Sequence, residues 1–182
     1  AEVARKVNAD LIVIGSRGHS DHDGIFTGSN TEKVVRYSST PVLVVKSKPK
    51  SVNFNDIVLA TDFSEESVYA VKNAVELLNE LSNNVTLLHI NLPNLNFLST
   101  VEVEERIDSF LNLAKLKENS YSIARIADHD IEDGIINYTK RTEKDAIAMI
   151  THGRKGLSHL FGGSISEDLV NHTSLPVVTF KL

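Results

Sequence analysis

The residues with the clearest chemical potential form a glycine- and serine-rich segment near the carboxyl end of the 182-residue chain. Gly153 and Gly163 precede the run Ser164, Ile165 and Ser166, which has the composition of a helix start. Backbone amides in a glycine-rich turn and at a helix amino terminus point toward an anion, and a missing Cβ lets its oxygen atoms approach closely. The segment therefore predicts a phosphate site; a tight connection that ends in a serine helix cap is the alternative interpretation.

Two further polar segments follow apolar runs that are typical of buried parallel strands. Residues 61–64, which include Asp62, come after the apolar run 56–61, and residues 91–94 come after the run 84–90. In open α/β sheets, ligands bind beyond the carboxyl ends of the strands, where the strand order reverses. We therefore expect ligand contacts from three loops: 61–64, 91–94 and 151–163.

The elements that must position these loops alternate from residue 51 onward. Predicted strands cover 56–61, 84–90, 121–127, 146–150 and 177–180; predicted helices run from a Ser64 cap through Leu78, and over 101–117, 131–141 and 164–172. This βαβαβαβαβ order predicts an α/β fold with a five-stranded, mostly parallel sheet, helices on both faces and right-handed crossovers.

A stretch near the start of the chain recurs near its end. Asp10 to Lys46 aligns without a gap on Asp145 to Lys181, 135 positions later, so one supersecondary unit is present twice. The identical positions of the first copy are Asp10, Ile12, Gly18, Phe26, Gly28, Ser29, Glu32, Val35, Ser39, Pro41, Val42 and Lys46. We therefore predict that residues 1–47 are the carboxyl-terminal part of a first domain, 48–53 a linker and 54–182 a complete second domain. The chain is then a tandem protein truncated at its amino terminus.

Composition excludes several function classes. A net charge of -5, with no basic patch beyond residues 46–50, argues against nucleic-acid binding. No apolar run reaches the roughly 18 residues of a membrane span and no signal peptide begins the chain, so we expect a cytoplasmic protein without membrane contact. The absence of cysteine rules out disulfides, a thiol nucleophile and thiolate metal ligands. The histidines and aspartates of residues 19–23 are more typical of a solvated loop than of a metal site, so no metal is expected.

The first copy of the repeat carries a spaced glycine motif. Its pattern, Gly-x2-Gly-x9-Gly-Ser over Gly15, Gly18, Gly28 and Ser29, resembles the nucleotide-binding pattern of the universal stress protein family, and the second copy keeps this spacing with Ile150 in place of the first glycine. Residues 61–64 and 88–90 are also similar to that family's segments after its first two strands. The resemblance spans the whole chain and implies a Rossmann-like fold of the adenine nucleotide alpha hydrolase type.

The resemblance also implies residue roles in the family's ATP-binding branch. Asp62 would hydrogen-bond the ribose or the nearby edge of adenine, and Ile90 and Met149 would flank the base. The phosphates would be surrounded by Gly153, Gly163, Ser164, Ile165 and Ser166. In the first copy the glycine set is complete, but the loops that would face it are not part of residues 1–47.

The function implied is that of a stress-response regulatory protein that binds ATP or another adenine nucleotide, with or without magnesium. A nucleotide-free structural or interaction member that acts through dimerisation is one alternative, because Ile150 would place a β-branched side chain where the nucleotide approaches the backbone. A slow ATPase is another, but no second carboxylate for magnesium and no evident water-activating residue accompany Asp62, so no catalytic residue is expected. His89, in an apolar strand, is predicted to be a hydrogen-bonded core histidine.

The terminal strands of the two copies indicate self-association. Val42–Val45 and Val177–Phe180 are apolar, and a strand edge left bare invites pairing with another chain. In the family that the chain resembles, these last strands pair antiparallel across a twofold axis. We therefore expect the two halves to pair, and the protein to form a homo-oligomer.

Overall fold

All the described strands join one sheet in the order β1-β2-β7-β6-β3-β4-β5. The computed structural model describes residues 1–15, 29–46, 54–93, 97–151, 169 and 172–182. The strands are β1 (Ile12–Gly15), β2 (Val42–Val45), β3 (Phe54–Ala60), β4 (Ser82–Asn91), β5 (Ser122–Ala127), β6 (Ala146–Thr151) and β7 (Val177–Lys181). The helices are α1 (Glu2–Lys6), α2 (Ser29–Tyr37), the 3-10 turn η1 (Glu65–Ser67), α3 (Val68–Leu81), α4 (Thr100–Ala114) and α5 (Ile131–Arg141).

The sheet is wider than the sequence pattern predicts. Every neighbouring pair of strands is parallel except β2 and β7, so the prediction of a mostly parallel α/β sheet is confirmed. The prediction of a separate five-stranded sheet is wrong, because β1 and β2 extend the same sheet to seven strands. The physical reason is the apolar edge of β7, whose backbone groups are paired by β2.

The pairing of β2 with β7 follows the internal repeat. Leu43 pairs with Val178, which is its own repeat equivalent 135 positions later. Val42 pairs with Thr179, the repeat equivalent of Val44, and Val44 pairs with Val177, the repeat equivalent of Val42. The register therefore has twofold symmetry about the Leu43 and Val178 pair. The predicted antiparallel pairing of the two terminal strands is confirmed within one chain. It occupies one edge of β2 and one edge of β7, and β1 and β6 occupy the other two.

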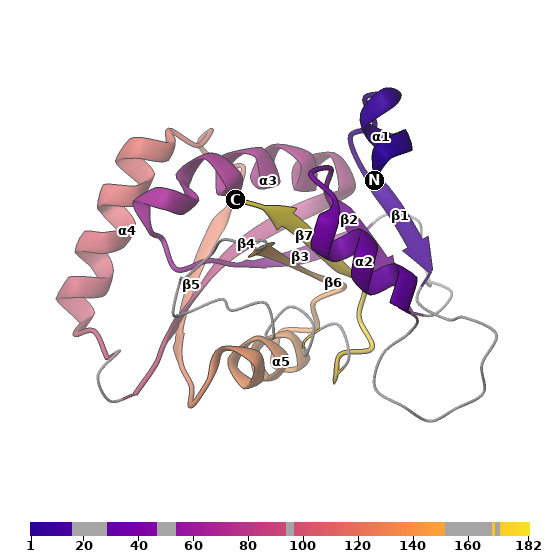
Figure 1. Ribbon diagram of the computed structural model, residues 1–182. Helices are drawn as coiled ribbons and strands as arrows, with labels where there is room; N and C mark the ends of the chain where they lie inside the picture. The colour runs from indigo at the N-terminus through magenta and orange to yellow at the C-terminus, as the bar shows by residue number, and fades with distance from the viewer. Residues whose placement is uncertain (16–28, 47–53, 94–96, 152–168, 170–171) are drawn as a thin grey trace.

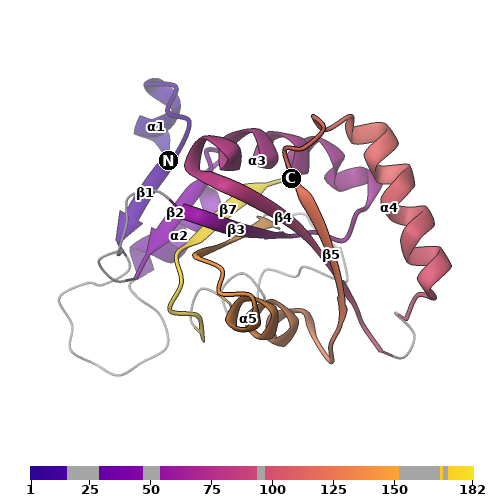
Figure 2. The ribbon, with the colours of Figure 1, turned by 180° about the vertical axis from the view of Figure 1, so that it is seen from behind.

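Helices cover both faces of the sheet, as Figures 1 and 2 show from opposite sides. On one face, α3 and α4 bury a core that includes Val71, Ile107 and Phe110. On the other face, α5 buries Ile131 and Ile135, and α2 packs partly buried valines against the same cluster. The central strands are consequently apolar at consecutive positions, as expected for a sheet covered on both sides.

The helix after β3 begins later than its predicted cap. Ser64 makes no side-chain cap bond and instead heads the short turn η1, while the hydroxyl of buried Ser67 donates to the Ser64 carbonyl at 2.8 Å. α3 then begins at Val68. The prediction of a helix directly capped by Ser64 is therefore wrong, because Ser67 directs its hydroxyl back into the turn.

The other helix boundaries follow local capping. Ser99 and Glu102 form a capping box at the start of α4, and the helix ends at Ala114 because Lys115 adopts a left-handed conformation with φ 47°. Asp130 caps α5, whose bounds agree with the predicted 131–141. The predicted helix over 164–172 lies outside the described residues except for 169 and 172. None of the described helices is long and apolar enough to cross a membrane.

Candidate functional site

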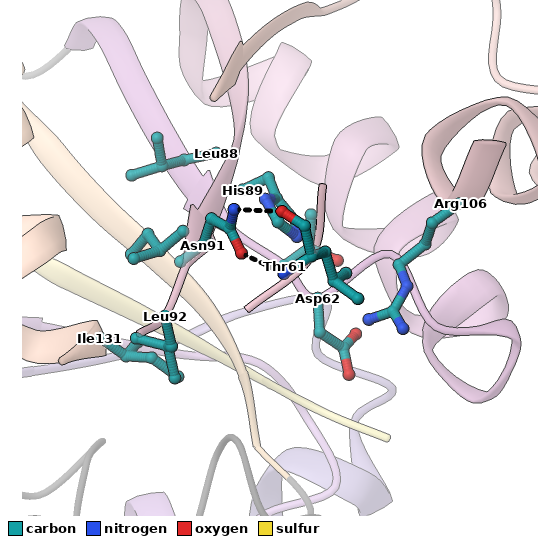
Figure 3. Close-up of a pocket in the computed structure, with 11 residues that line it drawn as sticks. Thr61, Asp62, Leu88, His89, Asn91, Leu92, Arg106 and Ile131 are labelled. Carbon is teal, nitrogen blue, oxygen red and sulfur yellow. Dashed lines mark hydrogen bonds between the residues drawn. The ribbon is translucent and has the colours of Figure 1, made fainter. Parts of the chain in front are cut away.

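A small pocket lies beyond the carboxyl ends of β3 and β4 (Figure 3). Within the sheet, β4 and β5 lie on one side of β3 and β6 lies on the other side, so the strand order reverses at β3. This is where open parallel sheets bind ligands. The pocket has a volume of about 40 Å³ and is lined by Ala60, Thr61, Asp62, Leu88, His89, Ile90, Asn91, Leu92, Leu98, Arg106 and Ile131.

The turn after β3 holds Asp62 through side-chain to backbone hydrogen bonds. Oγ1 of Thr61 accepts from the backbone N–H of Phe63 at 3.2 Å, and Oδ1 of Asp62 accepts from the N–H of Ser64 at 3.0 Å. The N–H of Thr61 donates to the Leu88 carbonyl at 3.1 Å, which ties the turn to β4. The second carboxylate oxygen of Asp62 has no hydrogen-bond partner among the described residues, and it can accept a hydrogen bond from a ligand.

Asn91 fixes the opposite side of the pocket. Its side-chain amide donates to the Leu98 carbonyl at 2.7 Å and its side-chain oxygen accepts from the Leu98 N–H at 3.0 Å. These two bonds hold the segment before α4 against the end of β4 (Figure 3). Ile90 and Ile131 add an apolar wall from β4 and α5. The pocket thus combines one carboxylate with a mainly aliphatic surface.

His89 is buried beneath the pocket, with 4% of its surface exposed. Its ring centroid lies 6.1 Å from that of Phe63, and its Nδ1 has no hydrogen-bond partner within the described part of the chain. Burial lowers the pKa of His89, and Arg106 and Arg125 lower it further, whereas Asp62 raises it. The core position predicted from the sequence is confirmed, and the predicted hydrogen bond is not made at Nδ1 by any described residue.

The predicted site residues are partly brought together. Asp62 and Ile90 both line the pocket. Met149 is buried on β6 and faces Ala60 across the β3 pairing, so it lies behind the pocket wall. Gly15 ends β1 and Ser29 begins α2, at the far side of the sheet. The remaining predicted residues lie outside the described ones: Gly18, Gly28, Gly153, Gly163, Ser164, Ile165 and Ser166.

Ile150 does not line the pocket. It is 4% exposed and belongs to the core cluster between the sheet and helices α3 and α4, together with Leu59 and Val178. At Gly15, its repeat equivalent, an added Cβ would meet nothing within 4 Å. The side chain of Ile150 therefore packs into the core. It does not reach the pocket that the described residues form, so it does not crowd a ligand there as predicted.

Sequence reasoning missed Arg106, Leu98 and Ile131. Arg106 lies on the exposed side of α4, which has the composition of a solvated face, and Figure 3 shows its side chain reaching toward Asp62. The other two are ordinary apolar positions at the ends of a loop and a helix. Only the folded arrangement brings these residues to the ends of β3 and β4, so no local signal marks them.

The geometry suits the binding of a small molecule with hydroxyl groups and an apolar ring. Asp62 supplies an acceptor, Arg106 supplies a positive charge, and Ile90 supplies an apolar contact. The pocket itself has room for only a few water molecules, and ligand sites for larger molecules span roughly 300–1,000 Å³. A ligand of that size would therefore extend beyond this pocket.

Comparison with known sequences supports a family assignment. The model of the Universal stress protein family matches residues 1–46 and 53–181. Universal stress protein Slr1230 of Synechocystis sp. is 23% identical over 180 residues, which cover 97% of this chain and 59% of that protein. The chain thus spans about three fifths of the length of this relative.

Solved structures share the fold. A putative universal stress protein from Pseudomonas aeruginosa UCBPP-PA14 superposes with a TM-score of 0.69 at 16% identity, over 98% of this chain and 66% of that one. A universal stress protein from Archaeoglobus fulgidus, solved in complex with dAMP, has a TM-score of 0.50 at 14% identity and covers 71% of this chain and 98% of its own. At these identities the likeness concerns the fold alone.

Proposed function

The chain belongs to the universal stress protein family, and we propose that it binds an adenine nucleotide such as ATP at the pocket beside Asp62 and Ile90. The observation that carries this proposal is the unshared carboxylate oxygen of Asp62, held by the turn after β3 at the point where the strand order reverses. A carboxylate oriented in this way is suited to accept hydrogen bonds from the vicinal hydroxyl groups of a ribose.

The proposed pose gives each described residue a role. Asp62 accepts from a ribose hydroxyl or from the edge of the base, Ile90 packs against one face of adenine, and Met149 supports the other side from β6. For the phosphates we propose contacts with amides and hydroxyls of Gly153, Gly163, Ser164, Ile165 and Ser166, which lie outside the described residues. The dAMP complex of the Archaeoglobus relative supports an adenine nucleotide as the ligand class.

The biological role that we propose is regulatory, with the bound nucleotide reporting cellular conditions during stress and with or without magnesium at its phosphates. Binding without turnover is part of the proposal. Phosphate released from ATP over hours, measured with the purified chain, tests this part, and release that disappears in the Asp62→Ala variant would favour a slow ATPase instead.

Isothermal titration calorimetry with ATP and with AMP tests the binding site. Asp62→Ala removes a charge-assisted hydrogen bond worth about 1.5–3 kcal/mol, so affinity is expected to fall about 10- to 100-fold. Asp108→Ala, which removes an exposed carboxylate on α4, is the matched control and leaves affinity unchanged. No heat of binding with the native chain, or an equal loss in both variants, would contradict the proposal.

Self-association is a further proposal, with the protein as a homo-oligomer. Because both edges of β2 and β7 are paired within the chain, the edge of β1 is the apolar candidate. Val13 on β1 is 64% exposed, whereas its repeat equivalent Ala148 on β6, a strand that pairs with β3, is 0% exposed and belongs to the core. Sedimentation analysis of the native chain and of Val13→Lys tests this: we expect a concentration-dependent dimer that the variant lacks, and a monomer at all concentrations would contradict it.

A further inference from the structure

Phe63 has an unusual backbone conformation. Its φ is 52°, in the left-handed region that bulky side chains rarely adopt. Of the described non-glycine residues with positive φ, Phe63 is the only aromatic one, and it immediately follows Asp62. A glycine would adopt this conformation freely. An aromatic side chain here must therefore be held by contacts that outweigh the unfavourable backbone.

Those contacts come from the core between the sheet and the helices α3 and α4. The ring of Phe63 is 2% exposed and stands edge-on to Phe110 of α4, with 5.2 Å between centroids and an interplanar angle of 81°. The ring centroid of His89 also lies near, at 6.1 Å with an interplanar angle of 46°. The T-shaped geometry of Phe63 and Phe110 is favourable for aromatic pairs, so the ring has one preferred position.

The anchored ring determines where the neighbouring carboxylate lies. The N–H of Phe63 is held by Thr61 at 3.2 Å, and the N–H of the next residue, Ser64, is held by Oδ1 of Asp62 at 3.0 Å. The second of these bonds requires the Ser64 amide to turn back toward Asp62, which the positive φ of Phe63 permits. One carboxylate oxygen is thereby occupied and the other is left toward the pocket.

We infer that Phe63 is a positioning residue for ligand binding: its ring, packed against Phe110 and near His89, holds the left-handed turn that keeps the Asp62 carboxylate in the pocket wall. The expected loss of AMP affinity rests on the proposed nucleotide function, but the expected change in the hydrogen bond between Ser64 and Asp62 does not. Phe63 itself does not line the pocket, so it acts only through Asp62.

The first test is a double-mutant cycle measured by calorimetry with AMP. Phe63→Leu keeps an apolar side chain but loses the ring contacts, and it is expected to weaken AMP binding about tenfold in the native background and not at all in Asp62→Asn. Phe110→Leu removes one of the two rings packed against Phe63 and should weaken AMP binding in the same background-dependent way. Ile57→Val is the matched control, because it removes buried apolar volume from the same core cluster without a ring contact to Phe63; it should leave AMP affinity within about twofold. Equal losses in both backgrounds, or an equal loss in Ile57→Val, would overturn the inference.

A second measurement is independent of any nucleotide. Amide hydrogen exchange of Ser64 in the ligand-free chain reports the bond to Asp62 directly. We expect faster exchange at Ser64 in Phe63→Leu, and in Phe63→Met should the first variant not fold, than in Ile57→Val. Equal Ser64 exchange in the Phe63 and Ile57 variants would refute the positioning role. If the native chain binds no AMP, the proposed function fails, and this exchange experiment still decides the role of Phe63.

Discussion

Replacing Ile150 with glycine restores the residue that the family pattern has at this position, and it separates two accounts of the site. If the isoleucine side chain blocks the nucleotide, Ile150→Gly should strengthen binding. The structure predicts otherwise, because the side chain is buried in the core between the sheet and helices α3 and α4. The variant should therefore lose stability and gain no affinity.

The magnitude follows from burial. Truncation of a fully buried isoleucine to alanine costs about 2–5 kcal/mol, and glycine within a strand costs a further 0.5–1 kcal/mol or so. We thus expect Ile150→Gly to lower the free energy of unfolding by about 3–6 kcal/mol, a large fraction of the roughly 5–15 kcal/mol typical of a domain. Ile150→Val is the conservative control, with an expected loss of about 0.5–1.5 kcal/mol.

Urea unfolding followed by circular dichroism measures the stability change, and calorimetry with ATP at a temperature where both variants are folded measures affinity. We expect ATP affinity to differ from the native value by less than about twofold, since the side chain does not line the pocket. An affinity gain of about tenfold with a stability loss below 1 kcal/mol or so would refute the reasoning, because it would place the Ile150 side chain at the ligand and not in the core.

Three further outcomes follow from described contacts. Asp145→Ala removes a carboxylate that accepts from two backbone amides of β3 at 2.8 and 3.1 Å, and should cost about 1–3 kcal/mol in urea unfolding, whereas Asp10→Ala, its exposed repeat equivalent, should cost almost nothing. Burial lowers the pKa of His89 in the folded chain below the ordinary value of 6.5, which applies in the unfolded chain. Below pH 6.5 the unfolded chain therefore binds more protons, so the free energy of unfolding should fall as the pH drops below that value. His89→Leu should flatten this pH dependence. Gly134→Ala would place a Cβ 3.0 Å from two side-chain carbons of Ile90, so nucleotide affinity should fall by about two- to tenfold while stability changes by less than about 1 kcal/mol; an unchanged affinity would show that Ile90 moves aside freely.

Local patterns predicted most of the elements. The bounds of α5 follow from its Asp130 cap and its apolar spacing, and the β3, β4 and β6 strands follow from their apolar runs. The end of α4 was placed three residues too late, because Lys115 adopts the left-handed conformation that a glycine would have signalled. Such a conformation at lysine depends on its surroundings and leaves no mark in the sequence.

The arrangement of the sheet and the wall of the pocket were less predictable. The pairing of β2 with β7 was expected from their apolar edges and from the family resemblance. That β1 and β2 thereby extend one sheet to seven strands was not predicted, because the apolar runs from residue 51 onward indicate only five strands. Asp62 was expected from its place in the loop after a predicted strand, and Ile90 from the family resemblance. Arg106 was missed because an arginine on an exposed helix face has the same local pattern whether or not the fold brings it beside a pocket.

The central claim is that an adenine nucleotide binds beside Asp62 at the ends of β3 and β4. The most direct test is to titrate AMP into the isotopically labelled chain and follow every backbone amide by NMR. We expect the largest shifts at residues 61–64 and 88–92, and we expect Asp62→Ala to abolish them. Shifts confined to another hollow of the described surface, such as the lysine-containing groove around residues 115–120, or no shifts at millimolar AMP, would contradict it.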